Sequence, residues 1–240
     1  MSTFPVPSSE LNTFPVLSAI PGFDPRDVPV VGSDGHLPAV PMQHLQAHAL
    51  AQRFLAPPVW LPEVLREPAF SNRPLRAAAV LIAIVTHSRP TVLLTLRAAH
   101  LNSHSGQIAF PGGKVDAADV SVAAAALREA HEEVGLPPGQ VRVLGQLPVY
   151  TTGSAFAVTP VVALVPPGVL LRADPSEVQD VFEVPLDFLM SPSHHRRHRV
   201  LWQGVQREWF SMPYDDQGTE RYIWGASAGM LRNLYRFLSA

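Results

Sequence analysis

The segment 120–134 constrains the fold of this chain more than any other, because its sequence predicts one amphipathic helix with defined ends. Asp119 or Ser121 can cap the start of the helix, since a short polar side chain there accepts a hydrogen bond from a free backbone N–H. Gly135 follows the last helical residue, where glycine commonly ends a helix in the left-handed conformation.

Three carboxylates are close together on this helix. Glu129, Glu132 and Glu133 are related by spacings of three and four residues, and we expect them on the face opposite the apolar one. The apolar positions are Leu127, Ala130 and Val134. Like charges at these spacings destabilise a helix by about 0.2–0.5 kcal/mol per pair, and a divalent cation would reverse that sign. Clustered carboxylates suit Mg²⁺ or Mn²⁺, whereas a solvated outer face is the alternative for the pattern taken alone.

The sequence before the helix predicts a strand hairpin and a glycine turn. An apolar run, a turn at 87–90 and a second apolar run favour two paired strands. The strands expected in this region are 77–85, 91–96 and 107–110. Gly112 and Gly113 then form a turn whose backbone can approach the helix or a ligand closely, because glycine has no Cβ.

The whole chain divides into an extension and one folded domain. Residues 1–72 are rich in proline and predict an irregular arm with one short helix at 43–55, and residues 73–240 form the domain. Further strands are expected at 141–147, 158–165 and 207–210, with a last helix at 226–238. Helices and strands mix without regular alternation, which favours the α+β class.

Composition excludes several kinds of protein. The absence of cysteine excludes disulfides, thiolate nucleophiles and cysteine-bound zinc. A net charge of −2 gives no overall attraction to nucleic acid or to anionic membranes, so we expect neither as a partner. Residues 1–21 lack the basic residues of a signal or transit peptide, and no apolar run reaches the roughly 18 residues of a membrane helix. We therefore expect a soluble, cytoplasmic protein, whose oligomeric state the sequence does not indicate.

The helix resembles the second half of the box of the Nudix hydrolases, written G-x5-E-x7-R-E-U-x-E-E-x-G-U with U a bulky aliphatic residue. Residues 128–136 match it, except that Ala130 is small for the U position. The first half differs, because one extra residue lies between Gly113 and Arg128. The first glutamate of the box therefore has no certain counterpart, and Asp116 and Asp119 are the candidates.

The longer spacing is similar to that of the Nudix subfamily that cleaves coenzyme A and its derivatives. The further segments that resemble this subfamily are 94–97, 101–113, 158–162, 177–186 and 223–225. The resemblance implies an α/β/α sandwich with a mixed sheet. It also implies a metal-dependent pyrophosphohydrolase that splits coenzyme A into 4′-phosphopantetheine and adenosine 3′,5′-bisphosphate.

The resemblance assigns roles to residues of the box. Glu129, Glu132 and Glu133 would bind Mg²⁺ or Mn²⁺, and Arg128 would orient Glu129 or hold the helix against the glycine turn. Because a carboxylate that only binds metal cannot efficiently accept the proton of water, a base from outside the box is expected. Glu177 is the first candidate for this base.

Other polar residues are candidates for binding substrate or for ordinary structural roles. His104 and Gln107, with Gly112 and Gly113, would touch the substrate or brace the turn. Glu183 is a second candidate for the base. The basic run 194–199 could receive a phosphate, but its sequence favours a mobile, solvated loop.

Three other functions are compatible with the sequence. The same site could hydrolyse another nucleoside diphosphate derivative, such as ADP-ribose or a dinucleotide. The fold could be a non-catalytic nucleotide-binding module, although retention of three mutually repelling glutamates argues against it. The proline-rich extension could be a recognition segment, but it lacks a clear P-x-x-P site.

Overall fold

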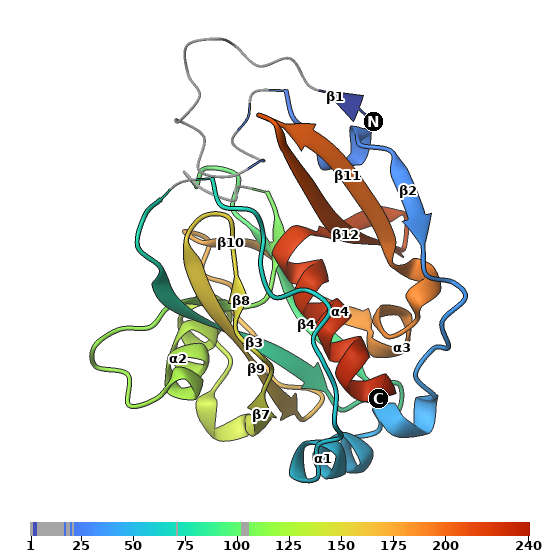
Figure 1. The fold of residues 1–240 in the computed structure, drawn as a ribbon. Helices are drawn as coiled ribbons and strands as arrows, with labels where there is room; N and C mark the ends of the chain where they lie inside the picture. The colour runs from blue at the N-terminus through green and yellow to red at the C-terminus, as the bar shows by residue number, and fades with distance from the viewer. Residues whose placement is uncertain (1, 4–16, 18–19, 21, 71, 102–105) are drawn as a thin grey trace.

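A mixed β-sheet forms the centre of the protein. The computed structural model describes residues 2–3, 17, 20, 22–70, 72–101 and 106–240, and Figure 1 shows the arrangement of their helices and strands. The strands of the sheet, in spatial order, are β10 (Val178–Pro185), β4 (Thr91–Arg97), β3 (Arg76–Val85), β9 (Phe156–Val165) and β7 (Arg142–Gln146). Since β3 and β9 run parallel while β3 and β4 form an antiparallel hairpin, the expected mixed sheet and hairpin are confirmed.

Short strands at the edges of this sheet shape the site described below. They are β5 (Ile108–Ala109) beside β4, β6 (Gly112–Lys114) beside β3 and β8 (Tyr150–Thr151) beside β9. Because β6 is antiparallel to the first half of β3, the glycine turn lies on the sheet itself rather than in a free loop.

Helices cover both faces of the sheet because successive side chains of a strand point to opposite sides. Leu81 packs in the core under α2 (Val122–Val134), whereas its neighbour Ile82 packs in the core that includes α4 (Gly225–Ser239). Helix α1 (Ala47–Leu55) lies near the C-terminal end of α4 in Figure 1, and its Leu50 packs in the core on the α4 side. The α+β class and the three-layer sandwich are therefore confirmed.

Helix α2 has the ends that its sequence predicts. Of the two candidate caps, Ser121 is the one used, because its hydroxyl accepts a hydrogen bond from Ala124 N at 3.0 Å. Gly135 ends the helix with φ of 67°, and its N–H donates back to the carbonyl of His131. The helix is therefore fixed at both ends above β6.

A second, smaller sheet packs on the other side of α4. Its strands are β1 (Ser2–Thr3), β2 (Val30–Ser33), β11 (Arg196–Trp202), β12 (Val205–Asp216) and β13 (Thr219–Trp224). The expectation of a mobile loop at 194–199 is wrong, because most of this run is strand β11, with His198 buried and its neighbours more exposed. The alternation of buried and exposed positions fits a half-buried strand, and the density of basic residues concealed it.

The extension packs against the domain where the structure describes it. The helix expected at 43–55 is present as η3 (Met42–Leu45) followed by α1, and Leu45 is fully buried. Glu63 bonds to Arg232 of α4 at 2.7 Å. The remaining short helices are η2 (Pro25–Asp27), η4 (Pro138–Gln140), α3 (Leu186–Leu189) and η5 (Pro192–His194). None of the helices in the described ranges is long and apolar enough to cross a lipid bilayer.

Candidate active site

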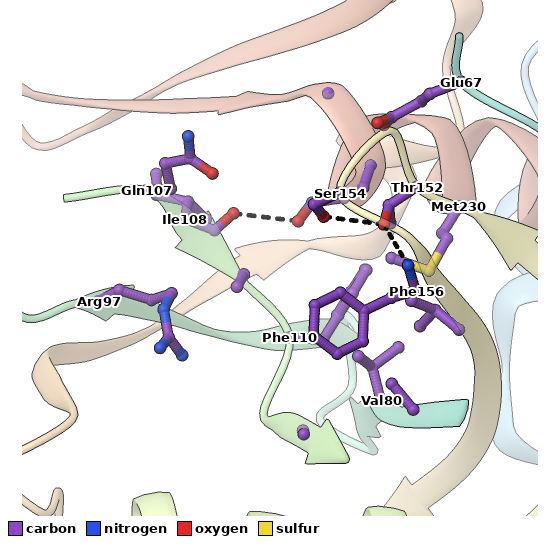
Figure 2. A pocket seen from close by; sticks show the side chains of 18 of the residues that line it. Glu67, Val80, Arg97, Gln107, Ile108, Phe110, Thr152, Ser154, Phe156 and Met230 are labelled. Carbon is purple, nitrogen blue, oxygen red and sulfur yellow. Dashed lines mark hydrogen bonds between the residues drawn. The ribbon is translucent and has the colours of Figure 1, made fainter. Parts of the chain in front are cut away.

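One cavity of about 580 Å³ joins the glutamates of α2 to residues of both sheets. Glu129, Glu133 and Glu177 line it, together with Arg97 and Gln107. Figure 2 shows Arg97 on one side of the cavity, and the apolar side chains of Val80, Phe110 and Phe156 gathered on the other. The cavity therefore combines a charged region with an apolar one.

Glu133 is buried at the charged end. Its carboxylate accepts a hydrogen bond from Gly112 N at 3.1 Å, and Arg97 Nη1 lies 3.5 Å from it. Burial raises the pKa of Glu133 to about 7, against the opposing effects of the Gly112 N–H and the Arg97 guanidinium. The sequence predicted Glu133 on the face opposite the apolar one, and the structure leaves it only 2% exposed because α2 packs this side on the glycine turn.

Glu129 lies directly over the second glycine of the turn. A Cβ added to Gly113 would lie 2.5 Å from the carboxylate atoms of Glu129, so glycine is required for the helix and the turn to approach this closely. Burial raises the pKa of Glu129, Arg128 opposes this shift, and the charges of Glu132 and Glu177 add to it.

Arg128 links Glu129 to the loop before the helix. Its Nη1 donates to Glu129 at 3.0 Å, and its Nη2 donates to the carbonyl oxygen of Lys114 at 3.0 Å. Asp119 accepts hydrogen bonds from Nε and Nη2 of the same guanidinium, both at 3.0 Å, and these bonds lower the pKa of Asp119. Arg128 therefore contacts both Glu129 and Lys114, the residue that follows the glycine turn, and its role in orienting Glu129 or in holding the helix stays a prediction.

The two candidates for the first acidic position of the box have different surroundings. The carboxylate of Asp119 bonds to Arg128, and Asp119 does not line the cavity. Asp116 does line the cavity, but its side chain is 66% exposed. The structure therefore makes Asp119 part of the support for Arg128 and Glu129.

Glu132 lies on the exposed side of α2, outside the cavity. Its side chain is 55% exposed, it accepts a hydrogen bond from Arg128 Nη1 at 2.9 Å, and it is not part of the cavity lining. The structure therefore does not bring the three expected metal ligands together. Consecutive residues of a helix lie about 100° apart around its axis, so Glu132 and Glu133 face different directions and only Glu133 lies over the turn.

Glu177 occupies a different position from Glu183. Glu177 immediately precedes β10 and lines the cavity, and its charge raises the pKa of both Glu129 and Glu133. Glu183 lies further along β10 and bonds to His87 and Thr91. It is absent from the cavity lining, so the structure favours Glu177 over Glu183.

The remaining candidates are only partly described. Gln107, Gly112 and Gly113 line the cavity. His104 lies outside the described residues. Arg97 had no predicted role beyond its place in a motif, and nothing in the sequence indicated that Phe70 or Arg207 lines the same cavity.

The carboxylates fit a hard divalent cation. Glu129 and Glu133 each have a pKa raised by burial and by the other acidic groups, so a cation beside them would offset unfavourable charge. Within the described part of the chain, no three histidine, aspartate or glutamate side chains already meet as a metal site. Glu129 and Glu132 instead bond to Arg128.

A carboxylate helix packed on a double-glycine turn of a mixed sheet defines a Nudix-type hydrolase. Residues 74–205 match the model of the NUDIX domain, and the chain belongs to the Nudix hydrolases, which act on phosphoric anhydrides.

Curated relatives belong to the same family. The chain is 44% identical over 173 residues to the uncharacterized Nudix hydrolase NudL of Shigella flexneri serotype 5b, covering 71% of this chain and 88% of the relative. It is also 44% identical to NudL of Photorhabdus laumondii, covering 66% and 83%. A solved Nudix hydrolase of M. Smegmatis, RenU, is 28% identical, with a TM-score of 0.39 and coverage of 48% and 72%. Nudix hydrolases generally need divalent cations.

Proposed function

We propose that this enzyme hydrolyses the pyrophosphate of coenzyme A or of its derivatives, releasing 4′-phosphopantetheine and adenosine 3′,5′-bisphosphate. The cavity supports this proposal because it joins the buried glutamates to an apolar wall. Coenzyme A has a charged pyrophosphate between a nucleotide and a long, weakly polar arm. The cavity volume of about 580 Å³ also falls within the range of roughly 300–1,000 Å³ that is usual for ligand sites.

Different residues would bind the metal, position its ligands and bind the phosphate during anhydride cleavage. Glu129 and Glu133 would hold Mg²⁺ or Mn²⁺, which when bound neutralises phosphate charge and acts as a Lewis acid. Arg128 keeps Glu129 in place through its bonds to Asp119 and Lys114 O. Arg97 lies beside Glu133, and its guanidinium can bind a phosphate oxygen by a charge-assisted hydrogen bond.

The sequence segments outside the box favour coenzyme A over other anhydrides. Segments 94–97 and 101–113 resemble the upstream motif of the coenzyme A subfamily, and Arg97, Gln107 and Gly112 from these segments line the cavity. Another nucleoside diphosphate derivative, such as ADP-ribose, would use the same glutamates but would have no weakly polar arm to place against the apolar wall.

Product analysis tests the proposed substrate. The purified protein is incubated with Mg²⁺ or Mn²⁺ and coenzyme A, acyl-coenzyme A, ADP-ribose, NADH or diadenosine polyphosphates, and the products are identified by mass spectrometry. We expect adenosine 3′,5′-bisphosphate and 4′-phosphopantetheine or its acyl form as the main products. Faster cleavage of ADP-ribose or of a dinucleotide than of coenzyme A would contradict the proposal.

Conservative variants test the assignment of the metal-binding pair. We expect Glu129→Gln and Glu133→Gln each to lower kcat by roughly 100-fold or more, because a bound metal supplies several kcal/mol of charge stabilisation. Glu132→Gln is the matched control on the same helix, and we expect less than a tenfold loss because its side chain lies outside the cavity. Circular dichroism checks that all three fold. Full activity of folded Glu129→Gln or Glu133→Gln would remove the assignment.

A further inference from the structure

The extension supplies part of the wall of the active-site cavity. Glu67, Pro68 and Phe70 line the cavity together with Glu129 and Glu133. These residues precede position 74, at which the match to the NUDIX domain begins. On the opposite side of the match, Arg207, Trp209 and Trp224 of the second sheet line the same cavity. The part of the cavity that these residues form is therefore an addition to the matched domain.

Specific contacts hold the segment 67–70 in this position. The carboxylate of Glu67 accepts hydrogen bonds from Tyr150 Oη at 2.9 Å and from Gly153 N at 2.8 Å. A Cβ on Gly153 would lie 2.7 Å from the ring of Phe70 and 2.8 Å from Pro68 O, so the segment is pressed against the backbone there. The wall is thus built into the fold.

Arg207, on β12 of the second sheet, holds Phe70 and the backbone before it in place. Its Nη1 donates to Pro68 O at 2.6 Å, its Nη2 donates to Ala69 O at 3.2 Å, and its guanidinium carbon lies 3.7 Å from the centre of the Phe70 ring. The residue is 5% exposed, and burial lowers its pKa. Arg207 forms no ion pair among the described residues, and its contacts with Pro68, Ala69 and Phe70 are the ones that position the segment.

The wall around Phe70 presents aromatic rings and hydroxyl groups together. Trp209 and Trp224 line the cavity and pack edge to face with ring centres 6.0 Å apart. Thr152 and Ser154 also line the cavity, and their hydroxyls are 2.9 Å apart near Phe156, as Figure 2 shows. The set combines flat apolar surfaces with groups that donate and accept hydrogen bonds.

This combination suits a nucleobase better than a saturated chain. Bases stack on aromatic rings and have donors and acceptors along their edges, which hydroxyl groups can pair. The hydroxyls of Thr152 and Ser154 bond to each other and keep further capacity for hydrogen bonds, which the edge of a base can use and a saturated chain cannot. We propose that Phe70 is a substrate-binding residue that stacks on the nucleobase, and that Arg207 is its positioning residue. The proposal rests on the proposed function only in placing the substrate in this cavity.

Equilibrium binding of two product-like ligands tests the role of Phe70. Calorimetry in the presence of Mg²⁺ compares adenosine 5′-monophosphate with ribose 5-phosphate, which lacks the base and cannot stack. We expect Phe70→Ala to weaken binding of the adenosine ligand by about 5- to 100-fold, the usual effect of losing one stacked base, and to leave binding of ribose 5-phosphate unchanged. Phe70→Trp should restore most of the lost affinity.

Two controls separate stacking from a general effect on folding. Phe188→Ala removes a half-buried ring that stacks on His194 away from the cavity, and both ligands should bind to it as to the parent protein. Arg207→Gln should produce the same selective loss as Phe70→Ala, and the double variant should lose little more than either single one, because both act through one ring. Additive losses would overturn the role of Arg207.

The outcome for Phe70 is distinguishable from the outcome for the proposed substrate, because the binding assay needs no hydrolysis. Equal loss of both ligands in folded Phe70→Ala, or no loss of either, would overturn the nucleobase proposal even if coenzyme A is hydrolysed. Selective loss of the adenosine ligand without hydrolysis of coenzyme A would overturn the proposed substrate and support the nucleobase site.

Discussion

Glu177 differs from the other two glutamates of the cavity in what its carboxylate contacts. Glu129 is held by Arg128, and Glu133 by Gly112 N and Arg97. Among the described residues, no hydrogen bond or ion pair engages the carboxylate of Glu177, whereas its backbone carbonyl accepts from Ala98 N at 2.9 Å. A free carboxylate beside the two proposed metal ligands is suited to accept a proton from the attacking water.

We therefore expect Glu177→Gln to lower kcat by about 100- to 10,000-fold, the usual contribution of a general base, with a much smaller change in KM. Steady-state kinetics with the substrate identified by product analysis measures both parameters. Glu183→Gln is the matched control, because Glu183 belongs to the same region but bonds to His87 and Thr91 outside the cavity. Wild-type kcat in folded Glu177→Gln would remove Glu177 as the base.

The sequence predicted the identity of individual residues better than their surroundings. Helical spacing correctly grouped Glu129 with Glu133, but it could not show that packing on the glycine turn would bury Glu133 and leave Glu132 exposed. That difference depends on which side of α2 meets β6, a tertiary contact between segments. Nothing in the sequence around Phe70 indicated a place in the cavity, since the position of its ring depends on Arg207, which is distant in the chain.

At the scale of elements, the contact between α2 and β6 determines the geometry of the site. The strand brings Gly112 N to Glu133 and places Gly113 under Glu129. The sequence predicted this pairing of a glycine turn with a carboxylate helix, because both elements have strong local signals. It missed β11 and did not anticipate β13, since neither has the apolar run that reveals β3.

We expect Gly113→Ala to reduce kcat by about 10- to 100-fold, because its Cβ would lie 2.5 Å from the carboxylate of Glu129 and displace it. A loss of about this size is usual when the residues that support a metal ligand are changed. Gly139→Ala is the matched control, since an added Cβ at that position meets no atom within 4 Å. Activity assays and thermal unfolding of both variants separate the loss of function from a loss of stability. Equal activity of the two variants would contradict the close approach of turn and helix.

At the scale of the whole molecule, buried charges join the extension, the second sheet and the last helix. Asp34 and Glu63 of the extension bind Arg232 of α4 at 2.8 and 2.7 Å, and both also bind Arg197 of β11. Arg232 is 1% exposed, so its buried charge depends on these two carboxylates for compensation. The extension expected to be an irregular arm is thereby tied to the core of the domain in the part that the structure describes.

His195 shares this cluster and must be neutral within it. Its Nε2 donates to the carbonyl oxygen of Leu189 at 2.8 Å, and its Nδ1 accepts from Arg232 at 3.2 Å, because a guanidinium has no acceptor to offer. Burial is the main cause that lowers its pKa to about 4, and the charge of Arg232 lowers it further, whereas the Leu189 carbonyl and Asp34 oppose the shift. The folded protein therefore resists protonation that the unfolded chain accepts near pH 6.5.

The consequence is a loss of stability in acid. Because the pKa of His195 is lower in the folded state, its contribution to the free energy of unfolding is fully present above about pH 6.5 and is lost as the pH falls toward about 4. At most about 3 kcal/mol is involved, since one pKa unit corresponds to about 1.4 kcal/mol. Urea unfolding of the parent and of His195→Gln between these pH values should show a difference that shrinks as the pH falls. The control is His48→Gln, on the exposed side of α1, whose plot of unfolding free energy against pH should run parallel to that of the parent. A parallel plot for His195→Gln would show that His195 does not resist protonation in the folded protein.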